Sequence, residues 1–343
     1  MSFEATSEHR TPRAHGESRC LVVMYHYVHD RDPFQQPGVS CKAPLRAMRI
    51  ADFRAQLDGL SAAMEPIDWP AFYAWMSGRA RVPQRCFLLT FDDGLIDHAS
   101  NVLPILEERG LRGAFFVPTS VLTGHRMLPA HQIHLLLSTL GEAGFAEELR
   151  AALRQHRAGH WCQWLERDDH PEHAEAHKMY HYESAGLGRL KFLLTMKLPL
   201  DLRALVLDEL FEQHVGSSAR WARHWYLGWD DLVGMEALGH TIGGHGHAHE
   251  AYSRMQEDDL QEDIARAAGI LREGLGPEAR PFSFPYGCAT EAAREACGGA
   301  GFVHGFTTQR RFADRQDEPH DLPRCDAIDV GLMLQEELAC PRA

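Results

Sequence analysis

The sequence lacks any pair of cysteines in a C-x-x-C arrangement, and its eight cysteines are scattered along the chain. Such spacing fits neither a zinc ribbon nor a disulfide framework, so we expect reduced thiols, several of them packed in the core. No apolar run approaches the roughly 18 residues of a membrane span. The first 19 residues also lack the apolar stretch of a secretory signal. These absences predict a cytoplasmic protein with no membrane span.

An excess of positive charge is also missing. The chain has 48 Asp and Glu against 35 Lys and Arg, a formal net charge of −13. This balance gives no electrostatic basis for binding nucleic acid or an anionic membrane surface. With 44% hydrophobic and 24% charged residues, the 343-residue chain has the composition of a folded protein, which excludes the disordered and low-complexity classes.

Predicted strands and helices alternate along the chain with short connections, which is the pattern of parallel βα units. Apolar runs rich in β-formers predict strands over residues 20–28, 86–91, 113–117, 240–244, 281–284 and 302–307. Six or seven such units are too many for a small sandwich and predict an α/β barrel.

Residues from about 122 to 228 have helical periodicity but little strand character. We interpret them as a helical insertion at one βα loop, on the face where barrels carry their sites. The tryptophans of the insertion offer surfaces for stacking sugars, although packing in its own core is the commoner fate of such side chains; they are Trp161, Trp164, Trp221 and Trp225. The predicted domains are a disordered polar leader over residues 1–19, a barrel over 20–330 that contains the insertion, and a C-terminal tail over 331–343.

Two adjacent carboxylates, Asp92 and Asp93, follow the apolar run 86–91. Charges at the end of a buried strand are costly unless they are paired, hydrogen-bonded or bound to a metal. The alternative is an ordinary Asp-Gly turn that leads into a helix. This segment alone favours the two interpretations equally.

Three histidines, His245, His247 and His249, alternate after the strand predicted at 240–244. In an extended chain or in a helical turn, His245 and His249 share a face and can converge on one ion. The glycines beside them let the backbone come close. A solvated loop is a serious alternative in a chain with 22 histidines, but the position after a core strand favours metal ligands.

One aspartate and two histidines make a site with open coordination positions. Such a site suits hydrolysis by a metal-bound water and also the oxygen chemistry of non-haem iron. The second aspartate favours a hydrolase, because it supplies a base beside the water.

Two further segments stand out, one after the strand predicted at 281–284 and one near the end of the chain. The Phe-Pro-Tyr-Gly turn at 284–287 is either an aromatic turn or the source of a backbone N–H for an oxyanion. The segment 322–326 contains Arg324 and Asp326, which form either a structural ion pair or part of the site.

The chain resembles polysaccharide deacetylases of the NodB-homology type (carbohydrate esterase family 4). The resemblance rests on T-F-D-D-G at 90–94, H-x-x-x-H at 245–249, F-P-Y-G at 284–287 and M-Y-H-Y at 24–27, in the order of the family. It covers the chain from about 20 to 330 apart from the insertion. It implies a distorted (β/α)7 barrel and metal-dependent removal of acyl groups from N-acetylated sugars.

The resemblance also implies roles for individual residues. Asp92 would be the general base and Tyr286 the backbone donor to the oxyanion. The metal ligands would be Asp93, His245 and His249.

The chain departs from the family pattern at three positions. Family members usually have an Arg two residues before the Pro-Tyr pair, where this chain has Ser283. Many members also have a histidine acid in a late L-x-H segment, where this chain has Arg324. Gly246 stands where the family usually has Ser or Thr.

A leaving amine needs a proton that neither Ser283 nor Arg324 can donate at neutral pH. We predict His26, near the end of the first strand, as the acid, with His304 as the alternative, and His247 or a substrate-derived proton after these. Arg324 and Pro285 are predicted to contact the substrate, Arg324 by holding an oxyanion or an anionic group.

We therefore predict a deacetylase or amidohydrolase that removes an N-acetyl or other N-acyl group from an intracellular sugar or sugar-containing precursor. The expected cofactor is one divalent ion. Zinc is preferred because it tolerates mixed nitrogen and oxygen ligands and keeps a position open for water; nickel, cobalt and manganese also fit. The alternatives are a non-catalytic carbohydrate-binding protein, a hydrolase of a small non-sugar amide, and an iron oxygenase.

Overall fold

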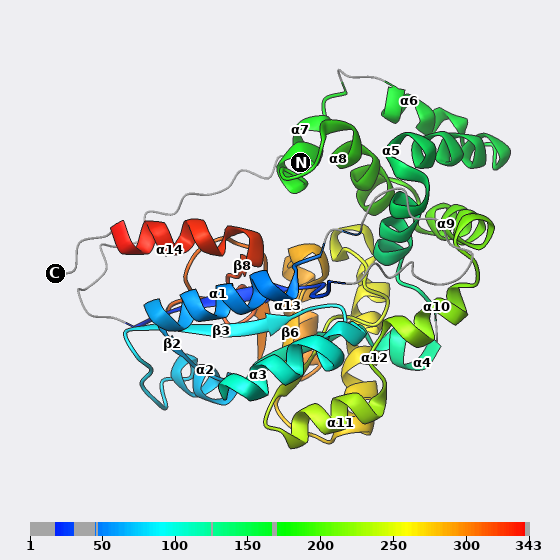
Figure 1. Cartoon of the computed structure of the whole chain (residues 1–343). Coiled ribbons are helices and arrows are strands. Elements are labelled where there is room, and N and C mark those ends of the chain that lie inside the picture. The colour runs from blue at the N-terminus through cyan, green and yellow to red at the C-terminus, as the bar shows by residue number, and fades with distance from the viewer. Residues whose placement is uncertain (1–17, 31–44, 46, 125, 167–169, 340–343) are drawn as a thin grey trace.

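The computed structural model describes residues 18–30, 45, 47–124, 126–166 and 170–339 (Figure 1). Nearly all of the polar leader expected over 1–19, and the last four residues of the expected tail, lie outside these described residues. The tail segment contains a helix, α14 (Val330–Ala339), which packs against α1 (Ile50–Ala63).

The described residues contain one parallel sheet of eight strands in the order β7-β6-β5-β4-β3-β1-β8, with β2 paired to β3. The strands are β1 (Arg19–Tyr25), β2 (Glu65–Pro66), β3 (Arg85–Phe91), β4 (Gly113–Val117), β5 (Thr241–Gly244), β6 (Pro281–Ser283), β7 (His304–Phe306) and β8 (Cys325–Asp326).

The sheet closes on itself through the segment that leads into β8. Phe306 in β7 forms a parallel bridge with Leu322, and Cys325 pairs with Val23 in β1. The predicted distorted (β/α) barrel is therefore confirmed. Its last strand escapes prediction because two residues give no periodic signal.

Helices cover the outside of the barrel, and apolar side chains of its strands pack in the interior. The barrel helices are α1, α2 (Trp69–Met76), α3 (Leu103–Arg109) after the π-helical turn His98–Val102, α11 (Trp229–Ala237), α12 (Glu257–Leu275), α13 (Glu291–Gly299) and α14. Alternate residues of the strands face two cores. Val22, Leu88 and Phe116 pack with the aromatic side chains of α2, and Leu21, Leu89 and Phe115 belong to the larger outer core.

The segment between β4 and α11 is helical, as predicted for the insertion. It contains α4 (Thr119–Gly124), α5 (Pro129–Gln155), α6 (Cys162–Glu166), α7 (His173–Met179), α8 (Ala185–Phe192), α9 (Leu200–His214) and α10 (Ser218–Trp225), with a 3-10 turn at Gly159–Trp161 and a π-helical turn at Leu193–Lys197. Figure 1 shows α5 to α9 gathered at one end of the molecule, beside the barrel. Among the described helices, none is both long and apolar enough to cross a membrane.

Close packing at Gly243 gives a prediction about the barrel. A Cβ at this position would lie 2.6 Å from both the Phe116 ring and the Pro281 carbonyl oxygen. We expect Gly243→Ala to lower the free energy of unfolding by about 1–3 kcal/mol, because overpacking forces the strands apart.

Gly269 in α12 is the matched control, since nothing outside its own helix lies within 4 Å of the place a Cβ would occupy. Gly269→Ala should be neutral or raise the free energy of unfolding by about 0.5–1 kcal/mol. Urea unfolding of both variants measures the difference. Equal stabilities would show that β5 tolerates a side chain here.

Candidate active site

Strand β3 places two carboxylates at the C-terminal end of the barrel. The backbone N–H of Asp92 donates to the carbonyl of Tyr25 in β1 (2.9 Å). Asp93 has φ +77° and Gly94 has φ +61°, so the chain turns directly after the strand. A left-handed aspartate is uncommon and indicates a backbone that its surroundings hold in place. Both carboxylates are buried, with 1% of Asp92 and 5% of Asp93 exposed.

A bidentate ion pair holds the carboxylate of Asp92. Arg324 Nη1 donates to Oδ1 (2.8 Å) and Nη2 donates to Oδ2 (2.7 Å). Burial by itself would raise the pKa of Asp92, but the charge of Arg324, followed by that of His245, outweighs burial and lowers the pKa to about 2. Asp92 is therefore ionised at neutral pH and available to accept a proton.

Arg324 has no donor left for a substrate. Its Nε donates to the carbonyl of Thr307 (3.0 Å), and the remaining hydrogens of Nη1 and Nη2 reach Thr90 Oγ1 (3.4 Å) and Ser283 Oγ (2.8 Å). All five N–H groups of the guanidinium are thus used inside the protein. Its partners are Asp92 and the groups around it. Arg324 also lines the cavity, and its predicted contact with substrate stays a prediction.

Ser283 stands where the resemblance leads one to expect an arginine. Its hydroxyl donates to Asp92 Oδ2 (3.1 Å) and accepts from Arg324. The guanidinium that is missing from position 283 therefore reaches the same carboxylate from the segment before β8. No sequence pattern indicates this pairing, since 232 positions separate Arg324 from Asp92.

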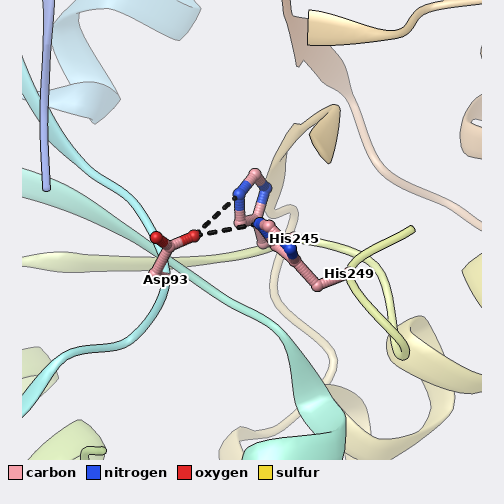
Figure 2. A group of neighbouring side chains, drawn as sticks. All are labelled: Asp93, His245 and His249. Atoms are coloured by element: carbon pink, nitrogen blue, oxygen red, sulfur yellow. Dashed lines mark ion pairs between the residues drawn. The ribbon is translucent and has the colours of Figure 1, made fainter. Parts of the chain in front are cut away.

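Asp93, His245 and His249 lie together, as Figure 2 shows. Asp93 Oδ1 is 3.0 Å from His249 Nε2 and 3.4 Å from His245 Nε2. One potential ligand atom from each of the three buried side chains lies within 4.8 Å of the others. Burial by itself would raise the pKa of Asp93, but the neighbouring imidazoles, His249 first, hold it well below its usual range.

The placement of the hydrogens on these side chains leaves lone pairs directed at the space between them, where a cation could bind. His245 Nδ1 lies 2.6 Å from the carbonyl of Ser283, so in the neutral ring this nitrogen carries the hydrogen and Nε2 presents a lone pair. That lone pair faces Asp93 Oδ1, a buried oxygen that accepts no hydrogen bond within the described chain. Acceptors that converge in this way suit a divalent ion with nitrogen and oxygen ligands.

Residues 245–249 form a loop, called the histidine loop below. It is held by groups other than Asp93, His245 and His249. Asp263 in α12 accepts the backbone N–H groups of His247 (2.9 Å) and Ala248 (2.7 Å). The ring of His247 lies 2.8 Å from Thr119 Oγ1. His247 is thus bonded to the start of α4 and does not belong to the group formed by Asp93, His245 and His249.

The insertion contributes two residues that sequence reasoning missed. His131 in α5 lies with Nε2 3.1 Å from Asp93 Oδ2 and Nδ1 2.6 Å from the hydroxyl of Tyr226. Burial lowers the pKa of His131, which favours the neutral ring. Neither residue has a distinctive sequence pattern around it.

Tyr286 lies in a 3-10 turn, Pro285–Gly287, with φ +57°. Its ring centroid is 5.2 Å from that of His249, and no backbone partner is found among the described residues for its N–H. Pro285 is buried, and its Cγ lies 3.6 Å from where a Cβ of Gly246 would be. Pro285 is not among the described residues that line the cavity, and its predicted contact with substrate stays a prediction.

The two candidate acids lie in different places. His26 follows β1 and lines the same cavity as the two aspartates, and its charge helps to lower the pKa of Asp92. His304 begins β7, and its ring packs 5.7 Å from that of Trp69 and 5.5 Å from that of Tyr73, both in α2. Neither His304 nor these two rings is among the described residues that line the cavity, which favours His26 over His304 as the acid.

The cavity above these residues has a volume of about 940 Å³. Its walls come from the barrel loops, including Arg310 and Asp329, and from the insertion, including His134, Tyr180 and Lys191. The insertion therefore lies over the site-bearing end of the barrel, as expected. Its four tryptophans are absent from the described walls, and Trp164, Trp221 and Trp225 are buried in the core.

Comparisons with known proteins identify a matching family and a shared fold. A family model described as polysaccharide deacetylase matches residues 79–159 and 208–304, together just over half of the chain. The match leaves out much of the insertion. None of the curated proteins matches the chain.

Solved structures with low identity share the fold. IcaB from Ammonifex degensii is 17% identical with a TM-score of 0.56, covering 93% of this chain and 96% of its own. The deacetylase PplD from Streptococcus pyogenes, solved with acetate, is 13% identical with a TM-score of 0.55, covering 93% and 98%. A de-N-acetylase from Aggregatibacter actinomycetemcomitans is 15% identical with a TM-score of 0.53, covering 90% and 94%.

The Arg324–Asp92 pair gives a stability prediction. Arg324→Gln leaves a buried carboxylate without its cation, and we expect the free energy of unfolding at pH 7 to fall by about 3–5 kcal/mol. The pair stabilises the fold fully above the unfolded pKa of about 3.9, and this contribution is lost as the pH falls toward 2. In Arg324→Gln, burial without the cation raises the pKa of Asp92. The fall in the free energy of unfolding at acid pH should therefore vanish.

Arg54→Gln is the control, because Arg54 pairs with Glu108 at 2.8 Å on the surface. Loss of that exposed pair should cost less than about 1 kcal/mol. Urea unfolding at pH 7 and near pH 3 gives both quantities. If Arg324→Gln is as stable as Arg54→Gln, the buried pair does not have the effect argued here.

Proposed function

This chain belongs to the polysaccharide deacetylase family, and on that basis we propose that it removes the N-acetyl group from a sugar with the help of one divalent ion. One observation carries the proposal. Asp92, held ionised by Arg324, lies beside the converging ligand atoms of Asp93, His245 and His249 at the floor of a cavity.

The metal ligands proposed are Asp93, His245 and His249. A divalent ion bound there would supply a Lewis acid that polarises the acyl carbonyl. Zinc suits two imidazoles and one carboxylate with a position left open. Nickel, cobalt and manganese are the alternatives.

Asp92 is proposed as the general base that accepts a proton from the attacking water. The fork of Arg324 and the hydroxyl of Ser283 fix the plane of its carboxylate. The low pKa keeps the base ionised, so the fall of activity on the acid side should come from other groups.

Two further groups complete the proposed reaction. The backbone N–H of Tyr286 is proposed to donate to the oxyanion that develops on the acyl carbonyl. His26 is proposed to protonate the leaving amine, since it shares the cavity with Asp92 and His304 does not.

The proposed substrate is a compact N-acylated sugar or sugar-containing precursor. A volume of about 940 Å³ lies within the usual range of small-molecule sites. The insertion closes one side of the cavity, which favours a short substrate over the middle of a long polymer. We also propose that the protein acts on this substrate inside the cell.

The metal-ligand and base assignments predict different variant behaviour. His249→Ala should lose zinc, because it removes a ligand. Asp92→Asn should keep zinc but lose about 10²–10⁴-fold in turnover, the usual effect of a lost general base. Acetate release from N-acetylated sugars, sugar phosphates and sugar nucleotides, with metal analysis of each preparation, measures both.

His247→Gln is the matched control within the same loop and should keep zinc. Full zinc occupancy in His249→Ala would refute the ligand set. Zinc binding without acetate release from any substrate in the wild-type protein would favour a non-sugar amide or a carbohydrate-binding role.

The role of His26 predicts a difference between leaving groups. An amine needs a proton as it leaves, whereas the phenolate of an aryl acetate does not. His26→Gln should therefore lose about 10²–10⁴-fold on an N-acetyl sugar and keep most of its aryl acetate hydrolysis. His304→Leu should leave the ratio of the two activities unchanged, and an equal loss on both substrates in His26→Gln would exclude it as the acid.

A further inference from the structure

A hydrogen-bonded chain connects the insertion to one oxygen of Asp93. The backbone N–H of Leu128 donates to the Tyr226 hydroxyl (2.9 Å), which lies 2.6 Å from His131 Nδ1. His131 Nε2 lies 3.1 Å from Asp93 Oδ2. His131 has no exposed surface, and Tyr226 is 5% exposed.

The donors in this chain run in one direction. Because the Tyr226 oxygen accepts from Leu128, its own hydrogen is available for His131 Nδ1. Nδ1 is then the acceptor, and the hydrogen of the neutral ring is on Nε2, directed at the carboxylate of Asp93. In this series of hydrogen bonds, each donor thus faces an acceptor.

Tyr226 is itself fixed to the turn that contains Asp93. It forms an antiparallel bridge with Leu95, and the N–H of Leu227 donates to the carbonyl of Gly94 (2.8 Å). Tyr226 is therefore linked to the Asp93 turn twice, through His131 and through the backbone next to it.

The two oxygens of Asp93 have separate environments as a result. Oδ2 accepts from His131, while Oδ1 is left facing the nitrogens of His245 and His249. Without the His131 donor, Oδ2 would be a buried oxygen with no partner, and rotation of the carboxylate would be opposed only by packing.

We propose that His131, supported by Tyr226, is a positioning residue that orients the Asp93 carboxylate for metal binding, so that the insertion forms part of the metal centre as well as a wall of the cavity. This inference rests on the proposed metal site. Hydrogen-bond partners of metal ligands usually contribute about 10–100-fold to metal affinity.

The test is zinc affinity, measured on the full chain by competition with a chromophoric chelator. His131→Leu removes the donor at similar volume and should weaken zinc binding by about 10–100-fold. His131→Gln, whose amide can donate to the same oxygen, should restore part of the affinity. Tyr226→Phe removes one hydroxyl only, and should weaken zinc binding in the same direction by a smaller factor.

His240→Leu is the matched control, because His240 is another buried histidine whose Nε2 lies 3.1 Å from a carboxylate oxygen, that of Glu107. Its Nδ1 accepts the backbone N–H of Gly113 (3.1 Å), and His240 is not among the described residues that line the cavity. Zinc affinity in this variant should equal that of the wild type. Thermal unfolding of the metal-free proteins separates a general loss of stability from a loss of metal affinity. A purely structural role would lower the unfolding temperature and leave the zinc affinity unchanged.

The outcomes distinguish this inference from the proposed function. If wild-type protein binds no divalent ion, the proposed metal site itself is wrong. If the wild type binds zinc and both His131→Leu and Tyr226→Phe bind it equally tightly, the metal site stands and the positioning role is refuted. Should His131→Leu fail to fold, Tyr226→Phe decides the question alone.

Discussion

Two neighbouring carboxylates buried at the end of one strand are the constraint on which the rest of this site depends. A buried charge is costly unless it is compensated, and separate parts of the chain compensate Asp92 and Asp93. Arg324 and Ser283 take both oxygens of Asp92, while His131 takes one oxygen of Asp93. Because the backbone turns at Asp93 with φ +77°, the two sets of partners do not compete. One carboxylate is held ionised by the protein alone, and the other keeps an oxygen for a cation.

The sequence predicts the groups that lie within one short segment and misses those that meet across the fold. The barrel strands and the Asp-Asp-Gly and histidine segments each occupy a few consecutive residues, so periodicity and spacing identify them. Arg324 reaches Asp92 across 232 positions, and His131 reaches Asp93 from a helix with no distinctive pattern. The departure at Ser283 raises the question of a lost arginine, which only the spatial arrangement answers. His304 and Pro285 are not among the described residues that line the cavity, since a residue near a strand end or in a motif need not face it.

The insertion is coupled to the histidine loop at further points. Arg203 in α9 forms a buried bidentate pair with Glu250, the residue after His249. Arg254 donates to the carbonyls of Thr195 and Leu198. Because breaking a buried pair leaves an uncompensated charge, the insertion cannot swing away from the barrel as an independent lid without a large cost. The wall of the cavity and the support of the histidine loop are therefore one structural unit.

The seam that closes the barrel also orients the proposed base. Arg324 lies between Leu322, which pairs with β7, and Cys325, which pairs with β1, and its Nε donates to Thr307 just beyond β7. Its guanidinium lies over the rings of Phe116 and Phe306, which belong to the core that packs with the aromatic side chains of α2. A bidentate guanidinium fork fixes the plane of the carboxylate that it binds. An arginine at the closing seam therefore reaches the carboxylate that one at position 283 was expected to orient, and the pairing of this segment with β7 and β1 sets its position.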